Sequence, residues 1–207
     1  MPEGAPTKQL TTTEQALLGM LARYGESSGY TLLRQAEEGI GFFWSPAKSH
    51  VYEVLPRLEQ RGLARRRVVA QVGKPDKHLW HLTTRGRAVL RRWINTPEPD
   101  PLGNLSVLLL KLFFGDFGDP AALVALVERF RDQLSERLSA LRHIGAEAVF
   151  TAPQELPRMT LRLGLAELEA HLGWAEANLP QLRARLPAAA PQHLSRSDKP
   201  TTRSERR

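Results

Sequence analysis

A single stretch of predicted β structure, set among helical segments, most constrains the fold of this chain. Residues 63–72 and 78–82 alternate or are β-branched, which is typical of strands, and the turn between them is Gly-Lys-Pro-Asp-Lys. Three segments with helical periodicity precede this hairpin and one follows it. We therefore expect a mainly α fold in which three helices, a two-stranded hairpin and a fourth helix form one domain.

Capping residues predict where the first two helices begin and end. Thr11 and Glu14 fit a capping box, in which each side chain satisfies a free backbone N–H at the start of a helix over residues 11–23. The second helix is expected over residues 30–38, and it ends at Gly39 because glycine readily terminates helices.

The third helix decides which side chains can reach a partner. Ser45 as N-cap and Pro46 in the first turn predict that it begins there and runs to about Arg61. Pro56 removes one backbone hydrogen bond inside this helix, so we expect a bend or an early narrowing there, but not a missing helix. Spacings of three and four predict its buried face, which consists of Val51, Val54 or Leu55, and Leu58.

The chain after the hairpin is predicted to be helical on both sides of a proline-rich linker. A fourth helix is capped by Thr83 or Thr84, and further helices are expected over residues 105–114, from Pro120 and from near Pro157. The whole chain then divides into a flexible N-terminus (1–10), a first domain (11–95), a linker (96–103), a helical dimerisation domain (104–187) and a disordered tail (188–207).

The last helix carries apolar residues at alternating spacings of three and four, as in a coiled-coil seam. Because the helical half offers little other surface to cover this seam, we expect a second copy of the chain to cover it in a two-fold homodimer. Pro180 should kink or end this helix. The residues assigned to dimerisation are Leu165, Leu168, Leu172, Ala175 and Leu179.

Positive charge is concentrated around the hairpin. The chain has a net charge of +7, and residues 57–92 alone contribute +9, with eleven Lys and Arg against two acidic residues. Such a concentration favours a polyanionic partner, most often nucleic acid, although a solvated basic face has the same composition.

Three helices, a hairpin and a fourth helix are the element order of a winged helix-turn-helix domain. In that fold the third helix enters the DNA major groove, and the hairpin, or wing, contacts the neighbouring backbone or minor groove. Lys48, in the first turn of the third helix, is expected to reach base edges, with a plain solvent lysine as the alternative. Five arginines follow at the end of this helix and in the first strand, and we expect two of them to contact phosphate: Arg57, Arg61, Arg65, Arg66 and Arg67. Lys74 and Lys77 flank the tip of the wing and are expected to bind DNA there.

Several short motifs in residues 13–94 resemble the PadR family of transcriptional regulators. They are Gly29-Tyr30, Ser49-His50-Val51-Tyr52, Gly62-Leu63, Gly73-Lys74-Pro75 and Trp80-His81-Leu82-Thr83. The sequence Leu-Leu-Lys-Leu-Phe-Phe-Gly at residues 109–115 resembles the start of the helical C-terminal domain of longer members. The resemblance implies a homodimeric regulator, usually a repressor and sometimes responsive to a small ligand.

The resemblance also implies that Tyr52 lies close to the DNA backbone. From the residues alone, Tyr52 is equally compatible with a core or interface aromatic. Ser49 and His50 share the start of the third helix, where His50 can bond to phosphate or to a base edge, or have no role. Pro56 departs from the helix-compatible residue that is usual in the family.

Other classes of site find little support in the sequence. His78 and His81 lie three apart on a strand and so point to opposite faces, which does not suit a metal site. We find no Gly-rich phosphate loop, nucleophile elbow or paired-carboxylate motif, and therefore predict no enzyme and no cofactor. Trp93 and Trp174 are candidate walls of an effector pocket, but ordinary packing explains them more simply.

The sequence predicts a cytoplasmic, DNA-binding repressor that acts as a homodimer on a palindromic operator. The chain has no cysteine, no signal-peptide pattern and no apolar run long enough to span a membrane. The expected partners are double-stranded DNA, a second copy and a small-molecule effector. The alternative is a helical interaction module whose winged helix binds a protein, and salt-dependent DNA binding would separate the two.

Overall fold

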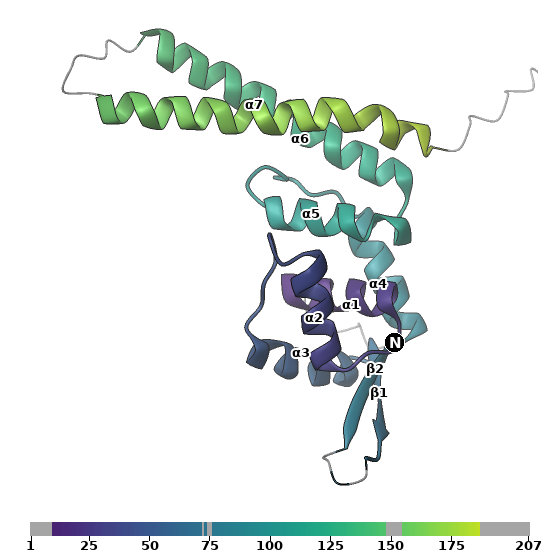
Figure 1. Ribbon diagram of the computed structural model, residues 1–207. Coiled ribbons are helices and arrows are strands. Elements are labelled where there is room, and N and C mark those ends of the chain that lie inside the picture. The colour runs from purple at the N-terminus through teal and green to yellow at the C-terminus, as the bar shows by residue number, and fades with distance from the viewer. Residues whose placement is uncertain (1–9, 72, 74–75, 148–154, 187–207) are drawn as a thin grey trace, which may run out of the picture.

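The computed structural model describes residues 10–71, 73, 76–147 and 155–186, and this part of the chain is mainly helical (Figure 1). The N-terminal half contains α1 (Thr12–Tyr24), α2 (Gly29–Gly39), α3 (Lys48–Gln60), β1 (Ala64–Val69), β2 (Lys77–Leu82) and α4 (Thr84–Asn95). The C-terminal half contains α5 (Leu105–Phe113), a 3₁₀ turn η1 (Gly115–Phe117), α6 (Pro120–Glu147) and α7 (Glu155–Ala184). The predicted winged helix followed by a helical half is confirmed.

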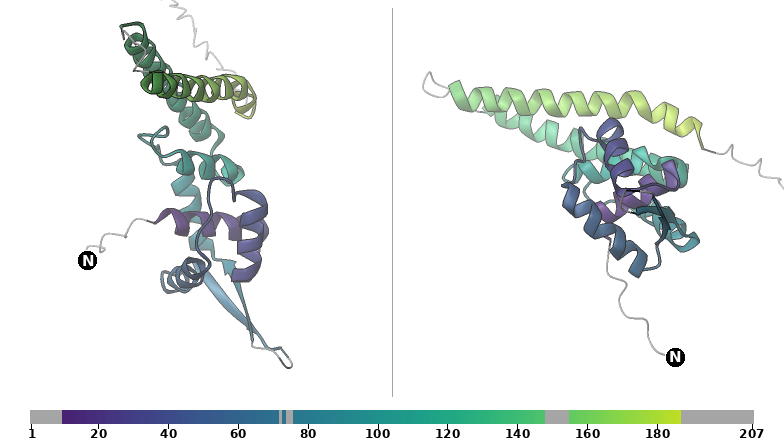
Figure 2. Two further views of the ribbon diagram at one scale, coloured as in Figure 1. Left: turned by 60° about the vertical axis from the view of Figure 1, so that its left-hand side comes forward. Right: turned by 60° about the horizontal axis from the view of Figure 1, so that its bottom comes forward.

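The elements are arranged between two opposite ends of the molecule. Helix α3 and the hairpin lie at one end, the α6–α7 pair lies across the other, and α5 lies between them (Figures 1 and 2). The predicted flexible N-terminus and disordered tail fall almost entirely on residues 1–9 and 187–207, which lie outside the described residues.

The first helix begins with the predicted capping box. The Glu14 backbone N–H donates to Thr11 Oγ1 at 3.2 Å, and the Thr11 backbone N–H donates to Glu14 Oε2 at 2.8 Å. Thr83 caps α4, as expected, by accepting from the Gly86 N–H. Ser28 was expected in a break between helices, but it caps α2 by accepting from the Thr31 N–H.

The hairpin is attached to the rest of the domain at its base. Strands β1 and β2 are antiparallel, with Ala64 opposite Leu82 and Val69 opposite Lys77. Ser27, between α1 and α2, exchanges two backbone hydrogen bonds with Trp80 of β2, at 2.9 and 2.8 Å. The base of the hairpin is therefore held against the turn after α1, while the strands themselves project away from the helices (Figure 1).

The predicted start of α3 at Ser45-Pro46 is wrong. The helix begins at Lys48, and its N-cap residue Ala47 has φ −59° and ψ 140° with no side-chain cap. Trp44 is buried in the core, so the connecting chain packs inward and stays non-helical until Lys48.

The interior of α3 agrees with the predicted pattern. The helix continues through Pro56 to Gln60, and Gly62 follows with a φ of +67°. Its inward face is confirmed and includes both candidate residues at the ambiguous turn, namely Val51, Val54, Leu55 and Leu58.

The proline-rich segment after α4 is attached to α6. The Leu102 N–H donates to Gln133 Oε1, and the Gln133 side-chain amide donates to the Pro99 carbonyl, both at 3.2 Å. Helix α5 then joins the two apolar clusters, because Leu110 and Phe114 pack with α1–α4 while Leu108 packs with α6 and α7. Division of the chain into two domains at residues 96–103 stays a prediction.

Lys111 of α5 is a buried cation at this junction. Only 2% of the residue is exposed, and its Nζ donates to the Thr96 carbonyl at 2.5 Å and lies 5.7 Å from the Trp93 ring centroid. Burial lowers the pKa of Lys111 below its ordinary value because it disfavours the charged form, and the attraction of Glu98 opposes this only in part.

The heptad seam of α7 packs against α6 within the same chain. Ala175 and Leu179 are fully buried beside Phe130 and Leu134 of α6. Leu168 and Leu172 pack more loosely on the same cluster, and Leu165 is half-buried. The expectation that the helical half offers little other surface to cover this seam is therefore wrong, because α6 supplies a periodic apolar face of its own.

Pro180 does not end α7, which continues to Ala184. The outer side of α7, opposite the seam, leaves large apolar side chains exposed at Leu156, Met159 and Leu163.

Replacing Lys111 by Met should remove a pH dependence of stability. The folded-state pKa of Lys111 lies below its unfolded value near 10.5, so the unfolded chain binds the extra proton between the two values. The free energy of unfolding of the wild type should therefore rise, relative to Lys111→Met, as pH increases toward 10.5. Urea unfolding of both proteins from neutral pH upward measures this, and parallel profiles would contradict the assignment.

Candidate nucleic-acid interface

The exposed face of α3 carries the predicted reading residues. Lys48 and Ser49 are exposed in its first turn, and Lys48 makes no ion pair or hydrogen bond with a described side chain. His50 is half-buried, with Nδ1 3.8 Å from Glu53 Oε2. Because the inward face is occupied by core residues, these side chains point away from the domain.

Tyr52 is not a core residue. It is 53% exposed, and its ring lies against the start of α2, where a Cβ on Gly29 would come within 2.7 Å of the ring. Glycine at this position therefore permits the close approach of α3 to α2. The alternative that Tyr52 is a core aromatic is excluded by this placement.

A groove runs between the start of α2, α3 and the hairpin. Its lining includes Tyr52 and Pro56 of α3, together with Arg66, Lys77 and His78 of the hairpin. Four consecutive residues at the start of α2 complete it, namely Ser28, Gly29, Tyr30 and Thr31. Sequence analysis used Gly29-Tyr30 only as a motif and missed that this segment shares a surface with the wing. The one feature of the sequence that pointed to this segment was the predicted start of the second helix near Tyr30.

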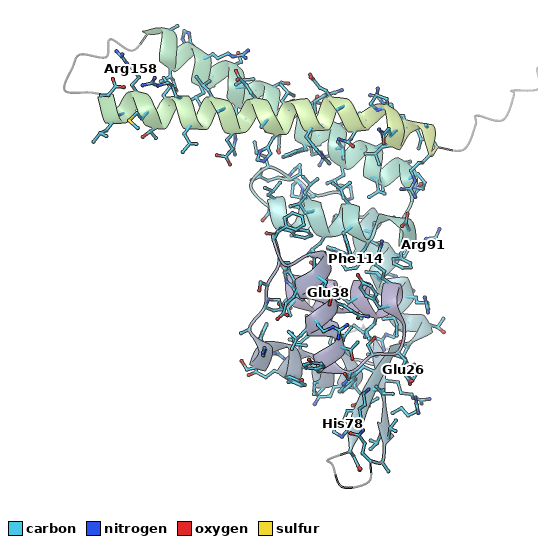
Figure 3. The ribbon with its side chains drawn as sticks, viewed as in Figure 1. Glu26, Glu38, His78, Arg91, Phe114 and Arg158 are labelled. Atoms are coloured by element: carbon cyan, nitrogen blue, oxygen red, sulfur yellow. The ribbon has the colours of Figure 1, made fainter. Side chains whose placement is uncertain are left out.

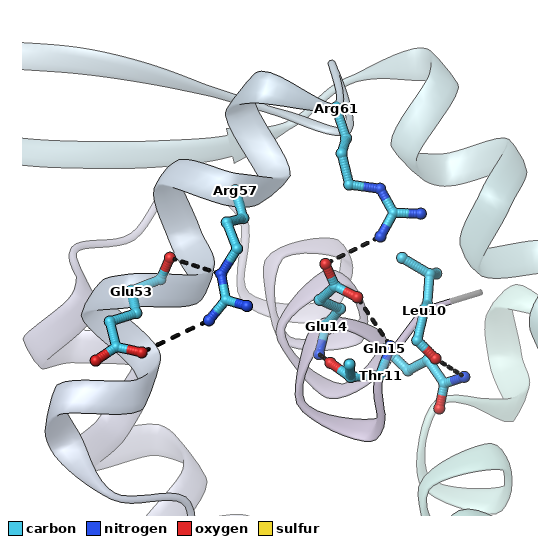
Figure 4. Close-up of polar contacts among 7 residues, drawn as sticks. All are labelled: Leu10, Thr11, Glu14, Gln15, Glu53, Arg57 and Arg61. Atoms are coloured by element: carbon cyan, nitrogen blue, oxygen red, sulfur yellow. Dashed lines mark hydrogen bonds and ion pairs between the residues drawn. The ribbon is translucent and has the colours of Figure 1, made fainter. Parts of the chain in front are cut away.

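Two predicted arginines at the end of α3 are engaged with carboxylates of the protein itself (Figure 4). Arg57 donates to the Glu53 carbonyl at 3.3 Å and lies 3.6 Å from its carboxylate. Arg61 pairs at 3.0 Å with Glu14, a buried residue that also forms the capping box of α1. Arg61 therefore fixes the end of α3 to α1.

The arginines of β1 differ in their availability. Arg66 Nε lies 3.8 Å from Glu59 Oε2, and its guanidinium carbon lies 5.8 Å from the centroid of the Trp80 ring. Arg67 hydrogen-bonds Glu26 through Nε at 2.9 Å and through a second nitrogen, which lowers the pKa of Glu26. Arg65, the second residue of β1, is exposed and makes no ion pair with a described residue.

The wing itself is only partly described. Lys77 is exposed at the start of β2, and no described carboxylate pairs with it. Figure 3 places His78 on the wing and Glu26 near its base. Val72, Lys74 and Pro75 at the predicted tip lie outside the described residues.

Helix α4 adds a basic surface that sequence analysis counted only as net charge. Four arginines on it are exposed and make no ion pair within the described part of the chain: Arg85, Arg87, Arg91 and Arg92. Arg91 lies toward α5, away from the hairpin (Figure 3). These residues belong to the flank of the domain and not to the groove.

The structure offers little support for other classes of site. His81 Nδ1 lies 3.9 Å from Glu26 Oε1, whereas His78 lines the groove, so the two histidines lie in different surroundings. No group of three or more possible metal ligands occurs among the described residues. None of the described helices is both long enough and apolar enough to cross a membrane. Trp93 packs with the first cluster and Trp174 against Phe130 of the second, so the two do not form one pocket wall.

Comparison with known proteins matches both halves of the chain. Residues 17–92 match the model of the transcriptional regulator PadR-like family, and residues 106–183 match that of the virulence activator alpha C-terminal domain. A probable transcriptional regulator of Mycobacterium tuberculosis, Rv1176c, is 32% identical over 165 residues, which are 72% of this chain and 87% of that protein. The chain belongs to the PadR-like family of transcriptional regulators.

Other relatives are more distant. The negative transcriptional regulator PadR of Bacillus subtilis is 27% identical over 81% of this chain and 95% of its own length. The solved structure of Bacillus subtilis PadR in complex with operator DNA is 26% identical, covers 83% of this chain and 99% of that one, and has a TM-score of 0.43. The same protein in complex with p-coumaric acid is 24% identical over 84% and 99% of the two chains, with a TM-score of 0.40.

Two neighbouring arginines of this PadR-like chain should differ in their effect on stability. Arg61→Ala leaves the buried Glu14 carboxylate with one hydrogen bond fewer, and should cost about 1–3 kcal/mol of unfolding free energy. Arg65→Ala removes an exposed side chain without a described partner, and should change that energy by less than about 0.5 kcal/mol. Chemical denaturation of both variants measures this, and equal losses would show that Arg65 has a structural role.

Proposed function

We propose that this PadR-like regulator binds double-stranded DNA through α3 and the wing, as a two-fold homodimer on a palindromic operator, and that it represses transcription. One observation carries the proposal. The middle of α3 at Tyr52 and Pro56, the start of α2 and the hairpin line one groove at the end of the molecule opposite α6 and α7, and Lys48 and Ser49 are exposed one turn earlier on α3. A duplex that receives α3 in its major groove can meet all three elements at once.

The electrostatics of this end suit a phosphate backbone. Lys48, Arg65 and Lys77 are exposed cations without a described carboxylate partner, so DNA contact does not require an existing ion pair to break. The start of α2 adds backbone N–H groups and the positive end of a helix dipole. The hydroxyls of Tyr30 and Tyr52 are further donors on this exposed surface.

The reading of bases is assigned to the first turn of α3. Lys48 is its first residue, and the later turns carry Glu53 and the paired Arg57. A lysine at the entering end of a recognition helix can donate to the acceptor edge of guanine. Ser49 and His50 lie beside it and would contact bases or phosphates nearby.

Repression is the proposed output. The Bacillus subtilis relative PadR, of which the match covers 95%, is a negative transcriptional regulator.

The second copy is assigned to the outer side of α7. Leu156 and Leu163 are 75% and 69% exposed although they are large and apolar. Leu156, Met159, Leu163, Ala166 and Ala170 follow one another at spacings of three and four, so they form one stripe along α7, opposite the seam buried on α6. Such a stripe on a regulator that reads two half-sites supports a helix-to-helix contact between copies.

Lys48→Ala and Arg65→Ala should separate base reading from phosphate contact. Lys48→Ala should weaken binding to the operator by about 1–3 kcal/mol and have much less effect on scrambled DNA. Arg65→Ala should weaken binding to both duplexes alike. It should also lower by about 1 the slope of the logarithm of affinity against the logarithm of salt concentration. Fluorescence anisotropy at several salt concentrations measures both effects.

Controls decide between the proposal and its alternative. Phe42→Ala, at an exposed residue away from the groove, should leave DNA binding unchanged. If the wild type binds neither duplex, or binds both without salt dependence, the winged helix has another partner and the protein-binding alternative is favoured.

Leu163→Glu should turn the dimer into a monomer, because it places a charge in the centre of the α7 stripe. Phe42→Glu, at a residue that is also exposed and apolar, is the matched control and should remain dimeric. Sedimentation at micromolar concentration distinguishes the two. A dimeric Leu163→Glu protein would exclude the outer side of α7 as the interface.

A further inference from the structure

The exposed face of α4 is a basic surface that the proposed operator contact does not use. It carries four exposed arginines, none of which makes an ion pair within the described part of the chain: Arg85, Arg87, Arg91 and Arg92. Helix α4 has no acidic residue of its own. The nearest elements offer no spare carboxylate at Glu14 of α1, which pairs with Arg61, or at Asp116 of η1, which pairs with Arg185.

The four arginines form two parallel rows along this face. Arg87 and Arg91 are four residues apart, so they lie along one side of it. Arg85 and Arg92 are seven residues apart and lie along the other side. Ala88, exposed and small, lies between the rows, so no large side chain separates the guanidinium groups. At a rise of about 1.5 Å per residue, the longer row extends about 10 Å along the helix.

This arrangement is unfavourable for the helix itself. Like charges four residues apart, as at Arg87 and Arg91, repel each other. Arg85 and Arg87 also lie in the first turn, where the positive end of the helix dipole favours acidic side chains. A solvated surface requires neither feature, whereas a polyanion lying along the face would relieve both. The arginine face of α4 therefore indicates a polyanionic partner.

The arginine face continues into the proposed DNA-binding end at the base of the hairpin. A groove of about 550 Å³ at this place is lined by residues that include Arg65 of β1 and Thr84 at the start of α4. Arg85 extends toward the neighbouring turn between α3 and β1, because a Cβ on Gly62 would lie 3.8 Å from its Nη1 atom. Arg91 lies farther along, toward α5 (Figure 3). The cations thus lead from the hairpin along the flank of the domain.

We propose that the arginine face of α4 binds the phosphate backbone of DNA that flanks the operator, so that the duplex bends toward α4 where it leaves the wing. This inference rests on the proposed function, because α3 and the wing place the duplex. Arginine pairs with phosphate through parallel hydrogen bonds to two oxygens. A row of about 10 Å matches the axial rise of about three base pairs, at about 3.4 Å each. Such contacts offset the energy that bending DNA requires.

The arginine face suits a duplex better than an acidic protein. Protein interfaces depend on large, buried anchor side chains near their centre, often aromatic ones. The centre of this face is Ala88, which offers no such anchor. Its continuity with Arg65 also places it beside DNA that is already bound. An acidic protein partner is therefore the alternative outcome of the test.

Two duplexes that share the operator selected by the protein from a random pool test the proposal. The minimal duplex ends at the operator edges, and the extended duplex adds about 15 base pairs of scrambled sequence on each side, about one and a half turns. In excess unlabelled random DNA, the full-length wild type should bind the extended duplex about tenfold more tightly. Energy transfer between dyes at the two ends of the extended duplex should rise on binding, because bending brings the ends together.

The double variant Arg91→Gln/Arg92→Gln removes one arginine from each row, at the end of α4 away from the hairpin. It should bind the minimal duplex as the wild type does, lose most of the gain on the extended duplex and bend it less. Arg137→Gln/Arg142→Gln is the matched control, because it removes the same charge from exposed positions on α6. It should behave as the wild type on both duplexes.

Hydroxyl-radical footprinting of the wild type supplies a test that needs no variant. Protection should extend beyond both operator edges. The proposal is overturned if the wild type shows no gain, no bending and no protection of the flanks, which would leave the face to an acidic protein. It is also overturned if Arg91→Gln/Arg92→Gln keeps the gain, or loses equal affinity for both duplexes. Failure of the wild type to bind the minimal duplex would instead be failure of the proposed function.

Discussion

The packing of α3 against α1 is the contact on which the rest of the interface depends. Val54 and Leu58 bury one side of α3, and Arg61 at its end pairs with Glu14, the same carboxylate that completes the capping box of α1. One acidic side chain thereby links the start of one helix to the end of another. Because the inward face is fixed, Lys48 must point away from the domain. The hairpin, held to Ser27 by two backbone hydrogen bonds, then lies beside the exposed face of α3.

Helix α5 carries this arrangement into the C-terminal half. Its sequence is almost entirely apolar, so it has to be covered on several sides, and it contributes Leu110 to the first cluster and Leu108 to the second. The buried Lys111 bonds to the carbonyl that follows α4 and so attaches the two halves to each other at this helix. Since α6 covers the seam of α7, the proposed contact with a second copy is the outer side of α7. The proposed DNA-binding end and the proposed dimer contact are thus connected through packed helices.

Local signals in the sequence predicted the structure well, and tertiary contacts account for what it missed. The capping box and the hairpin depend on residues a few positions apart, and both were predicted. The start of α3 depends on burial of Trp44 in a core made by distant segments, and the rule for a Ser-Pro helix start contains no such information. The availability of the arginines depends on partners far along the chain, since Arg61 and Glu14 are 47 residues apart and Arg67 and Glu26 are 41 apart. A net charge cannot show that Arg65 has no ion-pair partner among the described residues while Arg67 is paired with Glu26.

Selection of duplexes from a random pool by the purified full-length protein tests the central claim most directly. A dimer that presents α3 twice selects a palindrome, with half-site centres one DNA turn apart, about 10 base pairs, or a multiple of it. The account predicts that the wild type selects such a motif. It also predicts that the Lys48→Ala protein loses the base preference within each half-site. Selection of no motif by a folded, dimeric protein, or of a single half-site without symmetry, would contradict it.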